Sequence, residues 1–418
     1  MIINIRANNC FVFENEIEMS LDADMRNRKF STNVYTENNF NILKVAGIFG
    51  PNNVGKTCFI KIIRCLRDVI LNKTFQIKSN IFSKSKICEF GFTFLEKGNK
   101  YSFDIKYDTK NKEFVYEKFS ELIKDQYGNE KEIIKLLKDT TKKKFNSEDE
   151  KLNDIIPLVA KNNILIYLLN TEDFKTLEEI KNILVSFSKK IDVIDMNNIP
   201  IEKTIEILKN KNRIQEKVVN FIKNADLDMD NFEYSETPTV KVKIESDEVG
   251  KPEENALELP ERLLDQFKLT SVYKGKPVSS ILFDSTGTKK IVALASYIIE
   301  SLEKGRILVV DEIDSSLHFK LTRAIVAMFN NELNFNAQLI FTVHDINLMD
   351  CKKLFRKEQI WFVHRDESGV YLYSLAEFTA NKDGIRETTD IIEKYKKGIL
   401  GALPEPELIK SLLEVQHE

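Results

Sequence analysis

The sequence predicts an α/β protein with a first lobe of mixed strands, a second lobe built on a mostly parallel sheet, and a helical insertion between the two. Three observations support this fold class. The segment 101–107 alternates apolar and polar residues, as antiparallel strands do beside solvent. The segments 43–49 and 307–310 are almost continuously apolar, which is typical of strands buried on both faces of a parallel sheet. Between 121 and 238 glycine is scarce, and isoleucine and valine recur at helical spacing.

These patterns divide the chain into three expected parts. Residues 1–120 form the first lobe, residues 121–238 the helical insertion, and residues 239–418 the second lobe. Within the insertion, the segments 201–208 and 213–222 are amphipathic. The apolar stripe does not keep a seven-residue register for long. We therefore expect a compact helical insertion rather than an extended coiled coil.

A glycine-rich loop lies between the first apolar strand and a helix. Residues 50–57 fit the pattern G-x-x-x-x-G-K-[ST], in the strand, loop and helix context that the pattern requires. Backbone N–H groups of such a loop, together with the start of the following helix, can surround a polyphosphate. The alternative is a glycine turn before a core helix, but the flanking strand and helix favour a nucleotide site. The expected binding residues are Gly50, Asn52, Asn53, Val54, Gly55, Lys56, Thr57 and Cys58.

Two carboxylates follow the apolar run 307–310, at the edge where parallel sheets bind ligands. Asp311 is placed to hold Mg²⁺ through its water shell, and Glu312 is a candidate general base for the attacking water. In the glycine-rich loop, Lys56 is expected to reach the β- and γ-phosphates of ATP, and the Thr57 hydroxyl to bind the Mg²⁺. A strand that simply ends at a polar loop is the alternative, and it is commoner for one acid than for two. The sequence predicts an ATPase.

His344 follows a second apolar strand, 338–343. At the tip of that strand it is expected to hydrogen-bond the γ-phosphate or to orient the water, as a catalytic residue beside Lys56 and Glu312. A lone histidine is more often structural. The neighbouring motifs favour the catalytic interpretation.

A second anion site is predicted at the start of a later helix. Ser285-Thr286-Gly287-Thr288 precedes the apolar helical run 291–299, and a serine and glycine turn at a helix N-terminus attracts anions. Taken alone, the segment is an ordinary N-cap. A monomeric P-loop enzyme has no need of a second anion-binding helix end.

Taken together, these motifs resemble ABC-type ATPase heads of the SMC-like kind, and most closely the stand-alone bacterial AAA-type ATPases of the abortive-infection AbiL and RloA group. The matching segments, in chain order, are Walker A at 50–57, the signature motif at 285–288, Walker B at 309–312, the D-loop at 314–318, the switch histidine His344, and the tail at 354–363 and 371–375. Two features depart from the pattern. The signature reads Ser-Thr-Gly-Thr rather than Ser-Gly-Gly-Gln, and no Q-loop glutamine can be placed.

The resemblance implies a head-to-head homodimer. ATP bound at Lys56 and Thr57 of one copy would meet Ser285, Gly287 and Thr288 of the other. Hydrolysis by Glu312 would then separate the two copies. An oligomer larger than a dimer is the alternative assembly. The family implies an anti-phage, abortive-infection ATPase that controls a separately encoded effector such as a nuclease. The alternative is an SMC-like DNA repair ATPase that clamps DNA. A transporter motor is disfavoured by the helical insertion.

The composition limits the cellular compartment and the partners that we expect for this protein. The net charge is −3, from 62 basic and 65 acidic residues, which neither requires nor excludes a nucleic-acid surface. The five cysteines form no C-x-x-C pair, which favours a reducing compartment. The N-terminus lacks the pattern of an export signal, and the apolar run 291–299 is too short to span a bilayer. We expect a cytoplasmic protein without a membrane partner.

Overall fold

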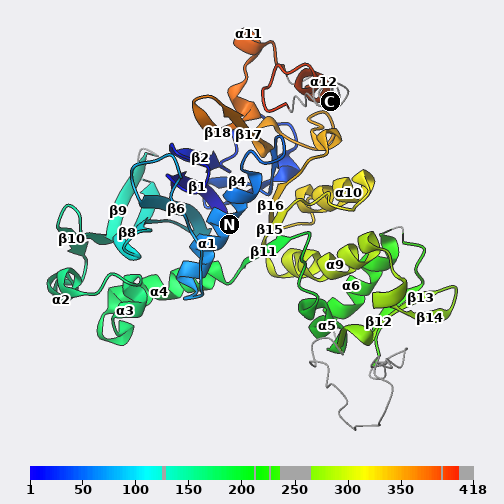
Figure 1. Cartoon of the computed structure of the whole chain (residues 1–418), viewed down its shortest axis with the longest axis horizontal. Helices are drawn as coiled ribbons and strands as arrows, with labels where there is room; N and C mark the ends of the chain where they lie inside the picture. The colour runs from blue at the N-terminus through cyan, green and yellow to red at the C-terminus, as the bar shows by residue number, and fades with distance from the viewer. Residues whose placement is uncertain (125–128, 211–212, 226, 236–264, 387–388, 404–418) are drawn as a thin grey trace, which may run out of the picture.

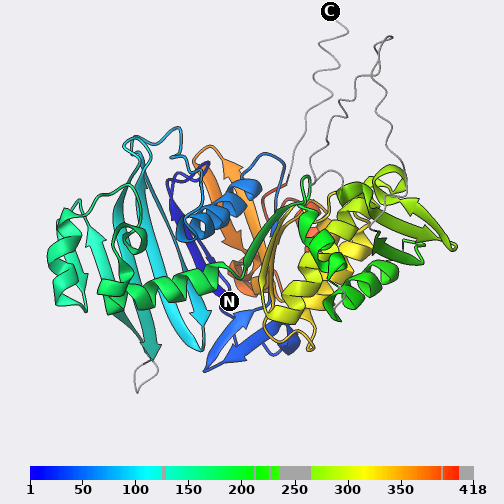
Figure 2. The ribbon, with the colours of Figure 1, turned by 90° about the horizontal axis from the view of Figure 1, so that it is seen from below.

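Two large β-sheets form the frame of the molecule, and a smaller lobe of helices lies at one end (Figure 1). The computed structural model describes residues 1–124, 129–210, 213–225, 227–235, 265–386 and 389–403. Figure 2 shows the same succession from a second direction: the wide antiparallel sheet, the central sheet and the helical lobe. The predicted α/β class is confirmed.

The first sheet has seven strands, and every pair of neighbours in it is antiparallel. In spatial order its strands are β10 (Lys144–Ser147), β9 (Glu130–Asp139), β8 (Glu113–Lys124), β7 (Asn99–Asp108), β6 (Ile87–Glu96), β1 (Ile2–Asn8) and β2 (Ile17–Ser20).

Helices cover one face of this sheet. They are α1 (Lys56–Ile70), α2 (Glu150–Ile155), α3 (Leu165–Leu168) and α4 (Lys175–Ser188). Phe187 of α4 stacks on Phe94 of β6, with 4.1 Å between the ring centroids. The opposite face carries polar side chains, as the alternation along the strands requires when one face packs on a core and the other meets water.

A buried ion pair joins two strands of this sheet beneath α3. Lys138 Nζ of β9 lies 3.0 Å from Glu117 Oε1 of β8, and the two side chains are 0% and 2% exposed. The second carboxylate oxygen, Oε2, accepts the N–H of Leu165 at 2.8 Å, at the start of α3. Burial raises the pKa of Glu117, and the charge of Lys138 opposes that shift. The pair therefore ties α3 to the sheet and needs both of its partners.

Lys138→Met would leave a buried carboxylate without its counter-charge. We expect this variant to lower the free energy of unfolding by about 3–5 kcal/mol. The double variant Lys138→Met/Glu117→Leu should recover most of the loss, because no charge is then left unpaired. Urea denaturation of the two variants and the wild type measures both effects. A single variant as stable as the wild type would contradict the role of the pair.

The second, central sheet has six strands and contains the strand that leads into the glycine-rich loop. In spatial order its strands are β11 (Ile191–Asp195), β15 (Ile307–Asp311), β16 (Gln338–Thr342), β5 (Val45–Phe49), β17 (Ile360–Asp366) and β18 (Gly369–Ser374). The first five run parallel, and β18 is antiparallel to β17.

Both faces of the central sheet are buried. Along β15, Val309 faces the core shared with α1, whereas Val310 faces the core formed with α9 (Thr286–Lys304) and α10 (Phe319–Asn330). Both valines are 0% exposed. The continuous apolar run in the sequence is the consequence of two covered faces.

The helical lobe packs on a third sheet of three antiparallel strands. Its elements are α5 (Glu202–Lys209), α6 (Arg213–Asn224), α8 (Ser280–Phe283), β12 (Asn231–Tyr234), β13 (Leu269–Tyr273) and β14 (Lys276–Ser279). Helix α9 belongs to both regions: Ile291 and Leu294 pack in the core of the central sheet, and Val292 and Ala295 pack in the core of the helical lobe. The core of the helical lobe and the core of the central sheet therefore share α9.

Short elements complete the described part of the chain. They are the strands β3 (Val34–Glu37) and β4 (Phe40–Leu43), the helices α11 (Ala380–Asp383) and α12 (Ile391–Lys396), and the 3₁₀ turns Ser31–Asn33, Ile156–Leu158, Thr171–Asp173, Ile346–Leu348, Lys357–Gln359 and Leu375–Glu377. Of the helices that the structure describes, none is long and apolar enough to cross a membrane.

The segment 121–238 is only partly helical, which corrects the prediction of a helical insertion. Helices α5 and α6 confirm the two amphipathic helices expected there. In contrast, β9 and β10 extend the first sheet, and β11 forms an edge strand of the central sheet. In β9, pairing with neighbouring strands outweighs local helical propensity. The boundary between 238 and 239 lies outside the described residues, and the division at 1–120, 121–238 and 239–418 stays a proposal.

Candidate functional site

The glycine-rich loop connects β5 to α1, as the sequence predicts. Gly50 has φ +144°, and a Cβ there would lie 2.4 Å from the carbonyl oxygen of Val363, so no larger residue fits. Helix α1 begins at Lys56, and the Lys56 side chain turns back across the loop. Its Nζ donates to the carbonyl oxygens of Gly50 at 2.6 Å and Pro51 at 2.9 Å. The lysine is thus held over the loop that would surround a phosphate chain.

The predicted magnesium and base residues lie at the end of β15. The Thr342 hydroxyl, from the end of β16, donates to Asp311 Oδ1 at 2.6 Å and accepts the N–H of Glu312 at 2.7 Å. One hydroxyl therefore holds the carboxylate of Asp311 and the backbone of Glu312. The sequence analysis did not identify Thr342, although a hydroxyl residue at the end of an otherwise apolar strand is a usable signal.

His344 joins the glycine-rich loop to the acid that follows β15. Its Nδ1 lies 3.2 Å from Lys56 Nζ, and its Nε2 lies 3.8 Å from Glu312 Oε1. The backbone N–H groups of His344 and Asp345 both donate to Asp314 Oδ2, at 2.9 and 2.8 Å. The structure therefore brings the three predicted catalytic residues, Lys56, Glu312 and His344, to one place.

Asn197 is a further residue at this site that the sequence analysis missed. It follows β11, whose last residue Asp195 pairs in register with Asp311 of β15. Asn197 Nδ2 donates to Glu312 Oε2 at 3.0 Å. No Q-loop glutamine was identified from the sequence, and Asn197 is the amide side chain that the structure places against the candidate base. The polar residues after the segment 191–194, which is apolar apart from Asp192, were the available signal.

The electrostatics at Lys56 suit an anionic ligand. Burial lowers the pKa of Lys56 to about 8, and the nearby carboxylates of Asp314, Glu312 and Asp311 oppose that shift. A lysine that is charged but poorly solvated gains from a phosphate group that replaces the missing water. Lys56 is 5% exposed, so this gain is not screened as it would be at the surface.

The serine turn lies at the N-terminus of α9, in contact with the chain's own D-loop. Ser285 caps the helix, because its Oγ accepts the N–H of Thr288 at 3.1 Å. Gly287 packs against Ser316, where a Cβ would lie 2.8 Å from the carbonyl oxygen. Ser285 and Thr286 are exposed. Among the described contacts, none joins this turn to the glycine-rich loop of the same chain, so the turn is open to another molecule.

The remaining predicted residues of the loop differ in exposure. Asn52, Asn53 and Thr57 are exposed, Val54 is buried, and Cys58 is half-buried. No group of three or more His, Cys, Asp or Glu that would enclose a metal occurs in the part of the chain that the structure describes. Mg²⁺ in nucleotide sites is held by one or two protein oxygens together with phosphates and water. Thr57 and Asp311 fit that chemistry.

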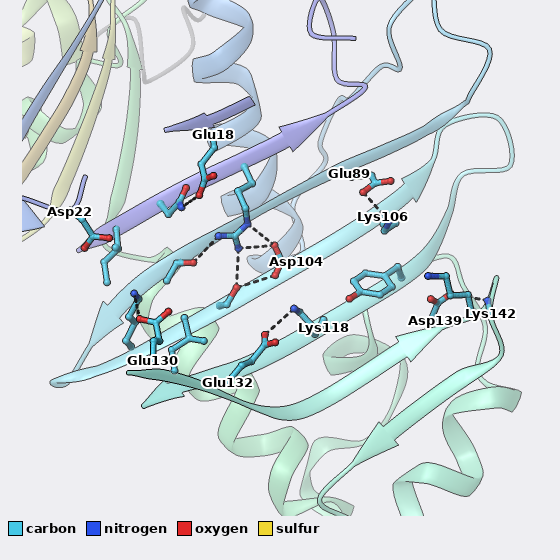
Figure 3. A pocket seen from close by; sticks show the side chains of 18 of the residues that line it. Glu18, Asp22, Glu89, Asp104, Lys106, Lys118, Glu130, Glu132, Asp139 and Lys142 are labelled. Carbon is cyan, nitrogen blue, oxygen red and sulfur yellow. Dashed lines mark hydrogen bonds and ion pairs between the residues drawn. The ribbon is translucent and has the colours of Figure 1, made fainter. Parts of the chain in front are cut away.

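A large open cavity of about 660 Å³ lies elsewhere, on the polar face of the first sheet (Figure 3). Seven acidic and five basic side chains line it. Four of the bases are ion-paired, in the pairs Arg6–Asp104, Lys100–Glu130, Lys106–Glu89 and Lys118–Glu132. A surface that binds a phosphate backbone needs an excess of positive charge, which this face lacks.

Comparison with known families identifies one match. The family model described as "AAA domain, putative AbiEii toxin, Type IV TA system" matches residues 45–350. The matched range contains the glycine-rich loop, the serine turn, β15 and His344. No curated protein matches the chain. The predicted resemblance to SMC-like and ABC-like AAA-type ATPases, and the predicted fold class, are confirmed.

Three solved structures of SMC heads are similar to this chain. The SMC head domain from Thermotoga maritima has 13% identity and a TM-score of 0.41, over 89% of this chain and 98% of that chain. The SmcHead bound to the C-winged helix domain of ScpA has 12% identity and a TM-score of 0.47, over 89% and 97%. The Smc head domain with an extended coiled coil, bound to the C-terminal domain of ScpA derived from Pyrococcus furiosus, has 12% identity and a TM-score of 0.42, over 94% and 99%.

Proposed function

Because this chain belongs to the family described as "AAA domain, putative AbiEii toxin, Type IV TA system", we propose that it binds ATP in the glycine-rich loop and hydrolyses it to ADP and phosphate. One observation carries the proposal. The imidazole of His344 lies between Lys56 of the loop and Glu312 after β15, at 3.2 and 3.8 Å. This arrangement suits ATP hydrolysis. Lys56 can bind phosphate, the carboxylate of Glu312 can accept a proton from water, and the His344 ring can contact both.

Each residue has a separate task in the proposed reaction. Lys56 leaves the carbonyl oxygens of Gly50 and Pro51 and neutralises the terminal phosphates. Glu312 takes the proton of the attacking water, and His344 orients that water or the γ-phosphate. Mg²⁺, held by Thr57 and through water by Asp311, would neutralise charge on the phosphate oxygens. Thr342 holds the carboxylate of Asp311 and the backbone of Glu312 in position.

Asn197 is proposed as a positioning residue for Glu312. Asn197→Ala removes a hydrogen bond to a charged group, worth about 1.5–3 kcal/mol. We expect kcat for ATP hydrolysis to fall roughly 10- to 150-fold, while KM changes little, since Asn197 contacts the base and not the loop. Asn198→Ala is the matched control and should retain wild-type kinetics. If KM rises as much as kcat falls, Asn197 acts in binding instead.

The second part of the proposal is a homodimer closed by ATP. The exposed Ser285, together with Gly287 and Thr288, would bind the triphosphate held by Lys56 and Thr57 of the other copy. Two separate anion-binding helix ends on one chain support this arrangement. The native mass of the protein, measured with ATP and without nucleotide, tests it: ATP should double the mass of 48.5 kDa expected for one chain. A mass that nucleotide leaves unchanged contradicts the closing role of ATP, and a larger increase indicates a higher oligomer.

The biological role proposed is control of a separate effector in anti-phage defence. The abortive-infection group that the motifs resemble supports this role, and the described residues contain no group of three or more His, Cys, Asp or Glu that could hold the metal of a nuclease. The test is purification of the whole operon product from infected and uninfected cells, with and without the Glu312→Gln change. Co-purification of a toxic partner favours defence. Salt-sensitive affinity for duplex DNA in the absence of a partner favours the alternative, a repair ATPase that clamps DNA.

A further inference from the structure

Asp284, directly before the serine turn, is a buried carboxylate with three hydroxyl donors. Its Oδ2 accepts from Ser271 Oγ and from Ser280 Oγ, both at 2.6 Å. Its Oδ1 accepts from Tyr273 OH at 2.8 Å. Asp284 is 6% exposed, and burial followed by the bond to Asp284 raises the pKa of Tyr273, so the phenol stays a donor. None of these four residues contributes to the ATP site described above.

The three donors come from two other elements of the lobe. Ser271 and Tyr273 belong to β13, and Ser280 begins α8. A buried carboxylate is costly unless hydrogen bonds replace its water, so the side chain of Asp284 is confined to one direction. The next residue, Ser285, is the N-cap of α9. The path of the chain into α9 is therefore set by a carboxylate one residue before the helix cap.

The direction of the Asp284 carboxylate also determines whether the surface of the turn carries a negative charge. A carboxylate exposed at this point would repel the triphosphate of an approaching copy. The hydroxyl cluster instead keeps the charge inside the lobe, and Ser285 and Thr286 are the exposed residues. The outward side of the turn thus presents hydroxyl and N–H groups together with the positive end of the helix dipole.

We propose that Asp284 is a positioning residue that holds the serine turn in the conformation able to bind the nucleotide of a second copy, and that Ser271, Tyr273 and Ser280 are its supports. This inference rests on the proposed ATP-closed homodimer. It assigns to the three-stranded sheet of the helical lobe a task in hydrolysis at the other copy's site. Asp284 acts through Ser285 and contacts no reacting atom.

The test combines two variants that each lose a different part of the proposed ATP site. Asp284→Asn disturbs the turn, whereas Glu312→Gln removes the base and leaves its own turn intact. We expect Asp284→Asn to bind ATP with wild-type affinity, since the glycine-rich loop is on another element, and to hydrolyse it at least about tenfold more slowly, a change of 1.4 kcal/mol in the barrier. Its unchanged ATP affinity also shows that the variant is folded.

Mixing the two inactive variants should restore hydrolysis. In a mixed dimer, the intact Glu312 of the Asp284→Asn copy meets the intact turn of the Glu312→Gln copy. When equal amounts are mixed before ATP is added, the first turnover should release about a quarter of the phosphate that the wild type releases, because half of randomly paired dimers carry one competent site. Tyr273→Phe, which removes a single donor, should show a smaller loss and the same recovery. The matched control is Asp265→Asn, which should hydrolyse ATP normally. Asp265 accepts the hydroxyl of Tyr234 at 2.7 Å in the same lobe, and among its described contacts none is with the turn.

Each outcome decides a separate question. Wild-type hydrolysis by Asp284→Asn overturns the inference about Asp284 and leaves the proposed dimer untouched. Recovery for Ser285→Ala mixed with Glu312→Gln, without recovery for Asp284→Asn mixed with Glu312→Gln, also overturns it, because Asp284 would then act within its own chain. If neither mixture recovers, the proposed ATP-closed dimer fails, and the role of Asp284 fails with it.

Discussion

Replacing Glu312 by glutamine is expected to slow ATP hydrolysis by about two to four orders of magnitude while ATP still binds. Glutamine keeps the shape of the side chain and the amide oxygen can still accept from Asn197, but it cannot take a proton from water. The glycine-rich loop and Lys56 are unchanged, so affinity for ATP should stay near that of the wild type. Since hydrolysis is the step proposed to open the dimer, the variant should accumulate as an ATP-bound dimer.

Three measurements on this variant separate the possibilities. Phosphate release gives the rate, equilibrium binding of a fluorescent ATP analogue gives the affinity, and light scattering gives the mass. Glu332→Gln is a suitable control, because Glu332 is exposed in the loop that precedes β16, at the opposite end of that strand from His344. Hydrolysis by Glu312→Gln at the wild-type rate would falsify the assignment of Glu312 as the base.

Replacing Lys56 by methionine is expected to weaken ATP binding by about 2–5 kcal/mol, which is roughly 30-fold to several thousandfold in Kd. The methionine side chain fills similar space but carries no charge. The terminal phosphates are then left without a positive partner in a poorly solvated loop. Lys61→Met on the exposed side of α1 is the matched control and should bind ATP normally. Equilibrium binding in the presence of Mg²⁺ measures both variants. Equal affinities would exclude Lys56 from the nucleotide site.

The lowered pKa of Lys56 adds a pH dependence to the same measurement. A lysine is charged below its pKa, and burial brings this pKa down to about 8. Attraction for the triphosphate is therefore fully present below that value and is lost as pH rises through it. We expect ATP affinity to begin falling above about pH 8, whereas Lys56→Arg should keep its affinity through this range because arginine stays charged.

The central sheet could be predicted from the sequence because its strands are buried on both faces. β5, β15 and β16 appear as continuous apolar runs, and each ends at a polar group of the site. Since the carboxyl ends of parallel strands meet at one edge, these runs also predicted that Lys56, Glu312 and His344 lie together. In this part of the chain the local pattern and the tertiary contacts agree.

β9 could not be predicted, for an identifiable physical reason. Its apolar residues occur as the doublets 133–134 and 136–137, which match helical spacing. In the structure, Ser120 of β8 pairs with Ile134, and Phe119 pairs with Leu136, so Lys135 is an extra residue in the ladder. This bulge interrupts the two-residue period of a strand. A local pattern cannot distinguish an interrupted strand from a helix.

The role of Asn197 could not be predicted because its position depends on β15, a strand far away in the sequence. β11 is five residues long, and the strand that positions it, β15, begins 116 positions later in the chain, at Ile307 rather than Ile191. Nothing near Asn197 in the sequence indicates that its amide meets Glu312. The hydroxyl donors of Asp284 lie only 4 to 13 positions earlier in the chain, and their contact with it becomes recognisable once β13 and α8 are folded beside it.

The order of strands in the central sheet has a consequence for biosynthesis. Both neighbours of β5 are made late: β16 begins at Gln338 and β17 at Ile360, whereas β5 ends at Phe49. A ribosome adding about 5–20 residues per second would need roughly 15–60 s to reach them. During that interval the nascent apolar segment has no partner strand and is a target for chaperones. The ATP site is therefore completed only after most of the polypeptide has been translated. A product that terminates before β16 would lack it.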